Sequence, residues 1–105
     1  MPSPLRHLVL FSFCPDLTSE AVAEAVERFS DLAASIEEVR CYEWGNEVSP
    51  EGLAQGYTHC FLLSFDDAAG RDRYLVHPLH LAFVDSIRPL LTQALVADFV
   101  DQGKR

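Results

Sequence analysis

The sequence lacks the usual marks of a metal-binding, disulfide-bonded or nucleotide-binding protein. Its three cysteines, Cys14, Cys41 and Cys60, form no CxxC pair, which argues against both a zinc knuckle and a disulfide framework. We interpret them as small buried hydrophobes in a reducing cytoplasm. No phosphate-binding loop and no dinucleotide fingerprint is present.

The sequence also lacks a long hydrophobic run. No stretch approaches the ~20 apolar residues of a membrane span. The apolar run after Arg6 is short and does not end in the small residues that a signal-peptide cleavage site needs. We therefore expect a soluble, cytoplasmic protein that has no membrane partner.

Basic residues are scarce. Eight Lys and Arg stand against sixteen Asp and Glu, which gives a formal net charge of −8 at pH 7. Such a surface repels phosphate backbones, so we expect no nucleic-acid partner. With 49% hydrophobic residues, six prolines and five glycines in 105 residues, the chain is too apolar for disorder. Its length predicts one domain over residues 1–105.

Hydrophobic spacing predicts four strands and two helical segments. The strands are expected at residues 6–13, 39–44, 57–65 and 93–100, the first helix at 18–35, and the second helical segment from about 67 to 88. Pro78 disfavours helical geometry at His77 and suits a helix start, so the second segment should be broken there. This βαββαβ order predicts an α+β, ferredoxin-like sandwich with both helices on one sheet face.

Several expected strands are apolar on both faces. In the first strand, Leu8 and Leu10 lie on the face opposite to that of Val9 and Phe11. In the third strand, Cys60 and Leu62 lie on the face opposite to that of Phe61. Since the helices cover only one face, the other needs a cover of its own. We therefore predict a homodimer that packs through the helix-free sheet face.

Four histidines are the candidate chemical groups: His7, His59, His77 and His80. Tyr74 lies one turn before His77, so the broken helical segment gathers a phenol and two imidazoles. An imidazole that titrates near neutrality is suited to removing a proton next to a carbonyl, and a phenol can orient it or stabilise an enolate. Equally, the histidines can be hydrogen-bonded core residues, with His77 capping the break. No Asp, Glu or Cys has ligand spacing around them, so we expect no metal.

Five short motifs occur in order along the chain. They are His7-Leu8-Val9-Leu10-Phe11, Glu43-Trp44-Gly45, Gly56-Tyr57-Thr58-His59, Tyr74-x-x-His77-Pro78-x-His80 and Asp98-Phe99. Over residues 6 to 101 the chain thereby resembles the stress-responsive A/B barrel (Dabb) family of the dimeric α/β-barrel superfamily. The resemblance implies a ferredoxin-like fold and a dimer whose two sheets form a barrel.

The resemblance also implies a site. One plant member of the family closes a linear polyketide thioester by aldol condensation without metal or cofactor. Its histidine and tyrosine correspond to His80 as the base and Tyr74 as the orienter or oxyanion donor. Carried onto this chain, the small-molecule pocket is expected to be lined by His7, His59, Val9, Phe11, Phe29 and Phe61.

Two functions of different class remain open at this stage. The first is a cofactor-independent cyclase or related proton-transfer enzyme that acts on a small, apolar, β-keto or polyketide-like compound. The second is a non-catalytic, stress-associated or ligand-binding dimer in which the histidines are structural. Oxygenase or haem-related chemistry occurs elsewhere in the superfamily, and no distinctive residue of this chain points to it.

Overall fold

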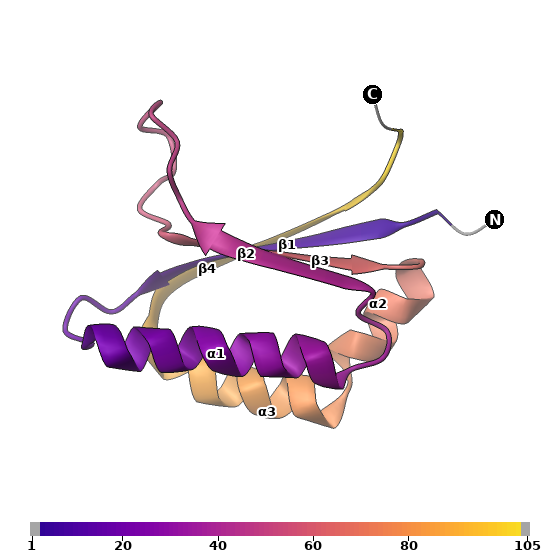
Figure 1. Cartoon of the computed structure of the whole chain (residues 1–105), viewed down its shortest axis with the longest axis horizontal. Helices are drawn as coiled ribbons and strands as arrows, with labels where there is room; N and C mark the ends of the chain where they lie inside the picture. The colour runs from indigo at the N-terminus through magenta and orange to yellow at the C-terminus, as the bar shows by residue number, and fades with distance from the viewer. Residues whose placement is uncertain (1–2, 104–105) are drawn as a thin grey trace.

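The computed structural model describes residues 3–103, and its four strands form one antiparallel sheet in the order β2-β3-β1-β4 (Figure 1). The elements are β1 (Leu5–Phe13), α1 (Ser19–Ser35), β2 (Cys41–Asn46), β3 (His59–Phe65), α2 (Ala68–Leu75), α3 (Pro78–Ile87), a short 3-10 turn (Arg88–Leu90) and β4 (Leu91–Val100). The predicted α+β, ferredoxin-like βαββαβ order with a broken second helical segment is confirmed.

Local hydrogen bonds set the helix starts. The Thr18 side chain accepts a bond of 3.1 Å from the backbone N–H of Ala21 and caps α1, as Thr at that position predicts. At the break, His77 caps α3 because its Nδ1 accepts from the backbone N–H of Leu79 at 3.1 Å, and Pro78 takes the first helical position. The capping role that the sequence left open for His77 is therefore the observed one.

Three strands begin two residues away from the predicted position. The second strand begins at Cys41, not at residue 39, because the backbone N–H of Val39 is held in a turn by the carbonyl of Ile36. The third begins at His59, since the backbone N–H of Tyr57 donates to Ala54 within the preceding loop. The fourth begins at Leu91, which pairs with Phe13 beyond a register shift.

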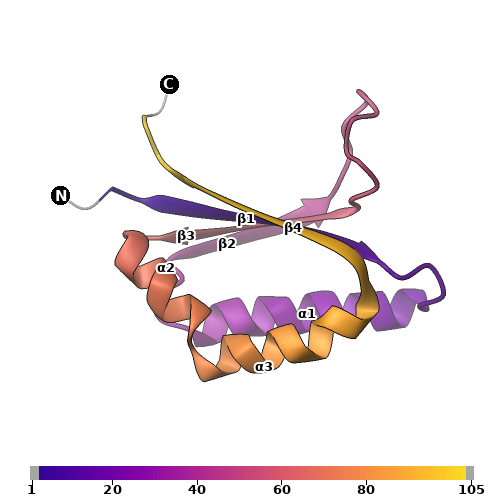
Figure 2. The same ribbon diagram turned by 180° about the vertical axis from the view of Figure 1, so that it is seen from behind.

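All helices lie on one face of the sheet (Figures 1 and 2). The core fills the space between them and is made of apolar side chains from β1, β3, α1, α2 and α3: Leu5, Val9, Phe11, Ala25, Val26, Phe29, Leu32, Ile36, Phe61, Leu63, Phe65, Tyr74, Phe83 and Ile87. On the helix-free face, Leu95 and Phe99 of β4 are exposed. The apolar residues expected on that face, Leu8, Leu10, Cys60 and Leu62, are half-buried. The helix-free face therefore carries partly exposed apolar side chains that the helices do not cover.

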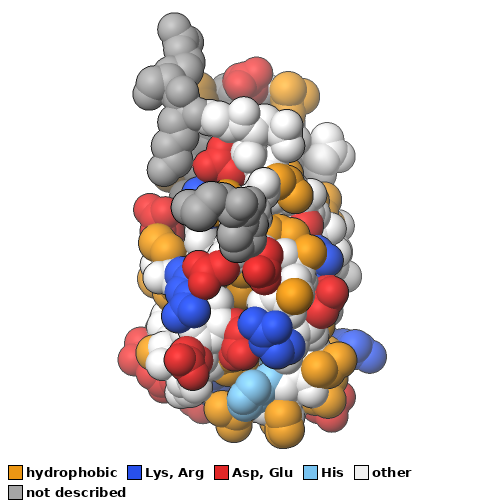
Figure 3. Space-filling model, turned by 90° about the vertical axis from the view of Figure 1, so that its right-hand side faces the viewer, with side chains coloured by type: hydrophobic (Ala, Val, Ile, Leu, Met, Phe, Trp, Pro, Cys, Tyr) orange, Lys and Arg blue, Asp and Glu red, His pale blue; other side chains and the backbone are white. Residues whose placement is uncertain are grey.

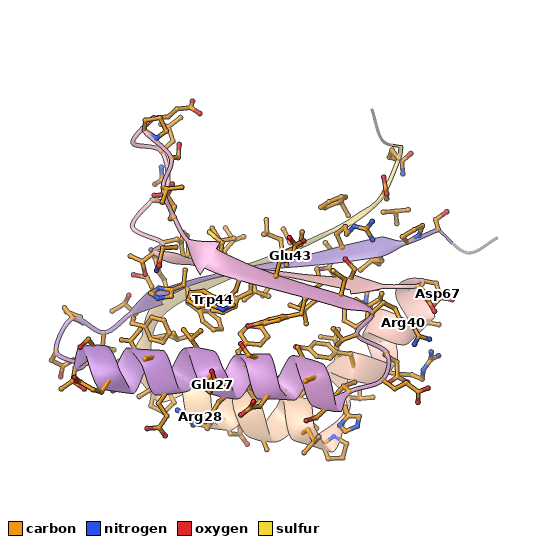
Figure 4. The ribbon with its side chains drawn as sticks, in the orientation of Figure 1. Glu27, Arg28, Arg40, Glu43, Trp44 and Asp67 are labelled. Atoms are coloured by element: carbon orange, nitrogen blue, oxygen red, sulfur yellow. The ribbon has the colours of Figure 1, made fainter. Side chains whose placement is uncertain are left out.

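Ion pairs gather at the end of the molecule where α2 lies. Arg40, just before β2, pairs with Asp66 at 3.0 Å, and Arg73 of α2 pairs with Glu38 at 3.1 Å. Figure 3 looks onto this end and shows acidic and basic side chains interspersed, and Figure 4 labels Arg40 there. No helix within residues 3–103 is long and apolar enough to cross a membrane.

The cysteines are less buried than predicted. Cys41 is exposed, and Cys14 and Cys60 are only partly buried. Cys41 lies opposite Ser64, on the helix-free face of the edge strand β2, so the helices of this chain do not cover it. The prediction of buried cysteines is therefore wrong for Cys41.

Candidate active site

A cavity of about 420 Å³ lies between α3 and the strands β1 and β4. Apolar and aromatic side chains dominate its lining: His7, Val9, Phe11, Phe29, Tyr74, His80, Phe83, Val84, Ile87, Arg88, Leu91, Thr92, Gln93, Ala94 and Val96. Six of the eight residues expected at the site from the sequence are among them. An apolar cavity that gathers a few polar groups is the usual form of a small-molecule site.

His80 lies in the first turns of α3 and is half-buried. Its Nδ1 lies 3.0 Å from the carbonyl oxygen of Leu75. A carbonyl only accepts, so Nδ1 carries the proton and Nε2 of the neutral ring holds the lone pair. Burial lowers the pKa of His80, against the opposing effect of the bond to Leu75, and nearby His7 and His77 lower it further. The ring is therefore a neutral base at neutral pH.

Tyr74, at the end of α2, is almost fully buried, and its ring centre lies 4.5 Å from that of His80. Burial raises the pKa of the Tyr74 phenol well above its ordinary value, so the hydroxyl keeps its proton and acts as a donor. Within residues 3–103, no group accepts a hydrogen bond from this hydroxyl. A ligand oxygen in the cavity is therefore a suitable acceptor for it.

His7 is held by a chain of charged groups. Its Nδ1 lies 2.6 Å from Oδ1 of Asp98, and Oδ2 of the same carboxylate accepts from Nη1 of Arg71 at 2.6 Å. The His7 ring meets the Tyr74 ring edge-on at 5.9 Å. One carboxylate on β4 thus connects α2 to β1 and sets the orientation of a histidine that lines the cavity.

Sequence reasoning missed Asp98 and Arg71 as site residues. The alternation of β4 was the available signal for Asp98, because it places the residue on the same face as Val96. No signal in the sequence pointed to Arg71, since its partner lies 27 residues away in the chain.

His59 and Phe61 do not line the cavity. His7 lies opposite Leu63 in the sheet, whereas His59 lies opposite Phe11, four residues further along β1. At about 3.3 Å per residue this separates the two histidines by roughly 13 Å. The two histidines thus share the face of the sheet that was expected for them, but only His7 lines the cavity.

The two residues have other neighbours. The Nδ1 of His59 lies 2.8 Å from the hydroxyl of Thr58, and its ring packs edge-on against Phe13 and parallel to Trp44. Burial lowers the pKa of His59. Phe61 stacks on Phe29 at 4.5 Å inside the core. Figure 4 shows Trp44 on the face of β2 turned toward α1, with Glu43 on the opposite face.

The described part of the chain holds no candidate metal centre. No three side chains of His, Cys, Asp or Glu within residues 3–103 lie close enough together to hold a metal ion. The polar groups available to a ligand in the cavity are imidazoles, a phenol, a guanidinium and neutral side chains.

The fold and the cavity together define a class: a small α+β protein of ferredoxin-like topology with a ligand-sized cavity between its helices and its sheet. The family model for the Stress responsive A/B Barrel Domain matches residues 5–101, and the chain belongs to this family. The resemblance inferred from the five motifs is thereby confirmed.

Known proteins agree with this assignment. The chain is 33% identical over 96 residues to the stress-response A/B barrel domain-containing protein HS1 of Arabidopsis thaliana, covering 91% of this chain and 88% of that protein. It is 25% identical over 95 residues to olivetolic acid cyclase of Cannabis sativa, covering 90% and 94%. A dimeric ferredoxin-like protein from Thermobifida fusca superposes with a TM-score of 0.79 at 28% identity, covering 96% and 93%.

Proposed function

We propose that the protein binds a small, largely apolar β-keto compound in the cavity and catalyses an internal aldol-type ring closure, or a related proton transfer, without a cofactor. The observation that carries this proposal is the arrangement of His80 and Tyr74. A neutral imidazole with a fixed tautomer lies beside a phenol that keeps its proton, and both line one apolar cavity. The 25% identity to olivetolic acid cyclase supports the same chemistry.

Each group then has one role in the reaction. Nε2 of His80 takes a proton from a carbon between two carbonyl groups, and the electron pair of that C–H bond becomes the enolate. The Tyr74 hydroxyl donates a hydrogen bond to the enolate oxygen. The enolate carbon forms a C–C bond with a third carbonyl carbon further along the same molecule, the π pair of that C=O moves to its oxygen, and the new alkoxide takes the proton back from His80. General base catalysis of this kind contributes typically about 10²–10⁴-fold.

The assembly that we propose is a homodimer packed through the helix-free sheet face. Exposed Leu95 and Phe99 lie on that face, and one copy has no helix to cover them. The similar Thermobifida fusca protein is described as dimeric. Burying apolar area of this kind contributes about 25 cal/mol per Å², which favours association.

Turnover of linear β,δ,ζ-triketo thioesters of different chain length tests the function, because the α-carbon of such a compound can close a six-membered ring on its ζ-carbonyl. Mass spectrometry would follow the loss of linear substrate and the appearance of the cyclised product. We expect turnover by the wild type and its loss in His80→Gln, while the melting temperature of that variant stays close to wild type. A His80→Gln protein with full turnover would contradict the role of His80.

A second function is favoured by one specific contact. Tyr74 packs against Phe65 at 5.2 Å and is almost fully buried, as expected of a core residue. If the histidines are structural, His80→Gln lowers the melting temperature, and no compound of the thioester panel is consumed or raises the wild-type melting temperature. That result would favour a non-catalytic, stress-associated dimer.

A further inference from the structure

Arg88 stands out among the residues that line the cavity. It is the one lining residue with a fixed charge, and no Asp or Glu is part of the lining within residues 3–103. The chain as a whole has twice as many acidic as basic residues. The lining of the cavity is therefore positively charged in a molecule that is negatively charged as a whole, and a positive lining favours an anionic ligand.

The position of Arg88 relative to His80 follows from the helix between them. Arg88 keeps helical backbone angles at the end of α3, φ −51° and ψ −45°, so the helix geometry extends across the eight residues from His80. At 1.5 Å per residue the two backbones are about 12 Å apart along the axis, and at 3.6 residues per turn they differ by only about 80° around it. Both therefore border the same cavity, toward its opposite ends.

The pairing of the strands also places Arg88 and the histidines at opposite ends of the cavity. His7 lies opposite Asp98 in the pairing of β1 with β4, whereas Phe11 lies opposite Ala94, four residues further along. Leu91 and Thr92, which follow the turn that contains Arg88, line the cavity beyond Ala94. The cavity thus has a histidine and tyrosine end and an arginine end.

The guanidinium of Arg88 is available for a ligand. Among residues 3–103 it has no ion pair and no side-chain hydrogen bond, and the residue is exposed. The other polar side chains at this end of the cavity donate elsewhere: the Thr92 hydroxyl donates to the carbonyl of Ser12 at 3.0 Å, and the Gln93 amide donates to that of Gln55 at 2.8 Å. An arginine at a helix end often binds the last carbonyls, yet Arg88 makes no such side-chain bond.

We propose that Arg88 binds the carboxylate of an amphipathic organic anion whose apolar body lies along α3 and whose other end reaches His80. The proposal names the substrate class of the site and rests on the proposed function for the chemistry at the His80 end. A carboxylate matches the forked donors of a guanidinium. The anionic group of the substrate and the carbon that loses a proton then lie toward opposite ends of the cavity.

Binding of decanoate, compared with its neutral analogue decanamide, tests the proposal by isothermal titration calorimetry. We expect the wild type to bind decanoate about tenfold more tightly than decanamide, as one charge-assisted pair predicts. Arg88→Gln should remove that preference and leave the affinity for decanamide unchanged. Arg73→Gln is the matched control, because it removes the same charge from the ion pair with Glu38, outside the cavity.

Three results would overturn the proposal: no binding of decanoate, equal affinity of the wild type for both compounds, or an equal loss of decanoate affinity in Arg88→Gln and Arg73→Gln. The measurement involves no turnover, so it is separate from the test of the reaction. If decanoate binds through Arg88 but no β-keto compound is turned over, the anion site is supported and the proposed function is contradicted. Conversely, turnover of an ω-carboxylate substrate with the same KM in wild type and Arg88→Gln would support the proposed function and contradict the anion site at Arg88.

Discussion

The Nδ1 of His80 and the carbonyl oxygen of Leu75 lie 3.0 Å apart across the break between α2 and α3. This bond requires the proton on Nδ1, so it selects the tautomer in which Nε2 is the basic nitrogen. Leu75 is the last residue of α2, and its carbonyl has no following helical turn to bond to. The break at Pro78 thus supplies the acceptor that orients the histidine.

The first prediction concerns the pH dependence of turnover. Burial lowers the pKa of His80, so the ring loses its proton at lower pH than an ordinary histidine does. We expect kcat/KM to rise with pH through a midpoint below 6.5, the ordinary value, and then to stay level, because the pKa of Tyr74 is raised and its phenol keeps the proton. A pH–rate profile checks this.

His59→Gln is the control for that profile. The pKa of His59 is also lowered by burial, yet this residue lies outside the cavity. We expect His59→Gln to keep both the activity and the rise of kcat/KM at acidic pH, the acidic limb of the profile. A midpoint above 6.5 in the wild type, or an acidic limb that disappears in His59→Gln, would contradict the assignment of the limb to His80.

The second prediction concerns the Tyr74 hydroxyl. Tyr74→Phe keeps the ring that packs against Phe65 and removes only the donor. If the hydroxyl stabilises the enolate, kcat falls by about 10²–10³-fold, as removal of one oxyanion donor does elsewhere, while KM changes little. Steady-state kinetics of the variant measure both constants. A loss confined to KM would assign the hydroxyl to substrate binding instead.

Much of the fold could be predicted from the sequence because the signals are local. Alternation in β1 and β3, the Thr18 cap and the break at Pro78 each depend on residues a few positions apart. The family motifs also pointed to His80 and Tyr74, which lie six residues apart in the chain and come together across one turn.

The rest of the site depends on register between distant segments. His7 and Asp98 are 91 residues apart in the chain, and only the pairing of β1 with β4 brings them to 2.6 Å. The same dependence explains the position of His59, which shares a sheet face with His7 but lies four positions away along it and outside the cavity. Hydrophobic alternation identifies the face of a strand and leaves its register open.

The third prediction concerns Arg71. Arg71→Met leaves one oxygen of the partly buried Asp98 carboxylate without its partner. We expect the free energy of unfolding to fall by about 1–3 kcal/mol, measured in urea. The variant should also lose the single tautomer of the His7 ring in long-range ¹H–¹⁵N spectra, because the carboxylate that fixes Nδ1–H is no longer held.

Arg73→Met is the matched control for this pair. Arg73 also lies on α2, but its bond to Glu38 is exposed to solvent, so its loss should lower the stability much less than the loss of Arg71 and leave the His7 signals unchanged. If both variants lose the same stability, the pair of Arg71 with Asp98 stabilises the fold no more than the exposed pair of Arg73 with Glu38 does. Unchanged His7 signals in Arg71→Met would show that Asp98 keeps its position without the arginine.

The last prediction tests the proposed dimer at its apolar face. Phe99 lies opposite Arg6 on the helix-free side of β4 and is 54% exposed in the single chain, so a second copy packed there would bury it. An aspartate buried in such an interface would lose its hydration, and an ion pair with Arg6 opposite would not fully offset that cost. We therefore expect light scattering to give the mass of two chains for the wild type and of one chain for Phe99→Asp. Leu81→Asp, at an equally exposed position on the helical side, should remain a dimer, and a wild type with the mass of one chain would refute the proposed assembly.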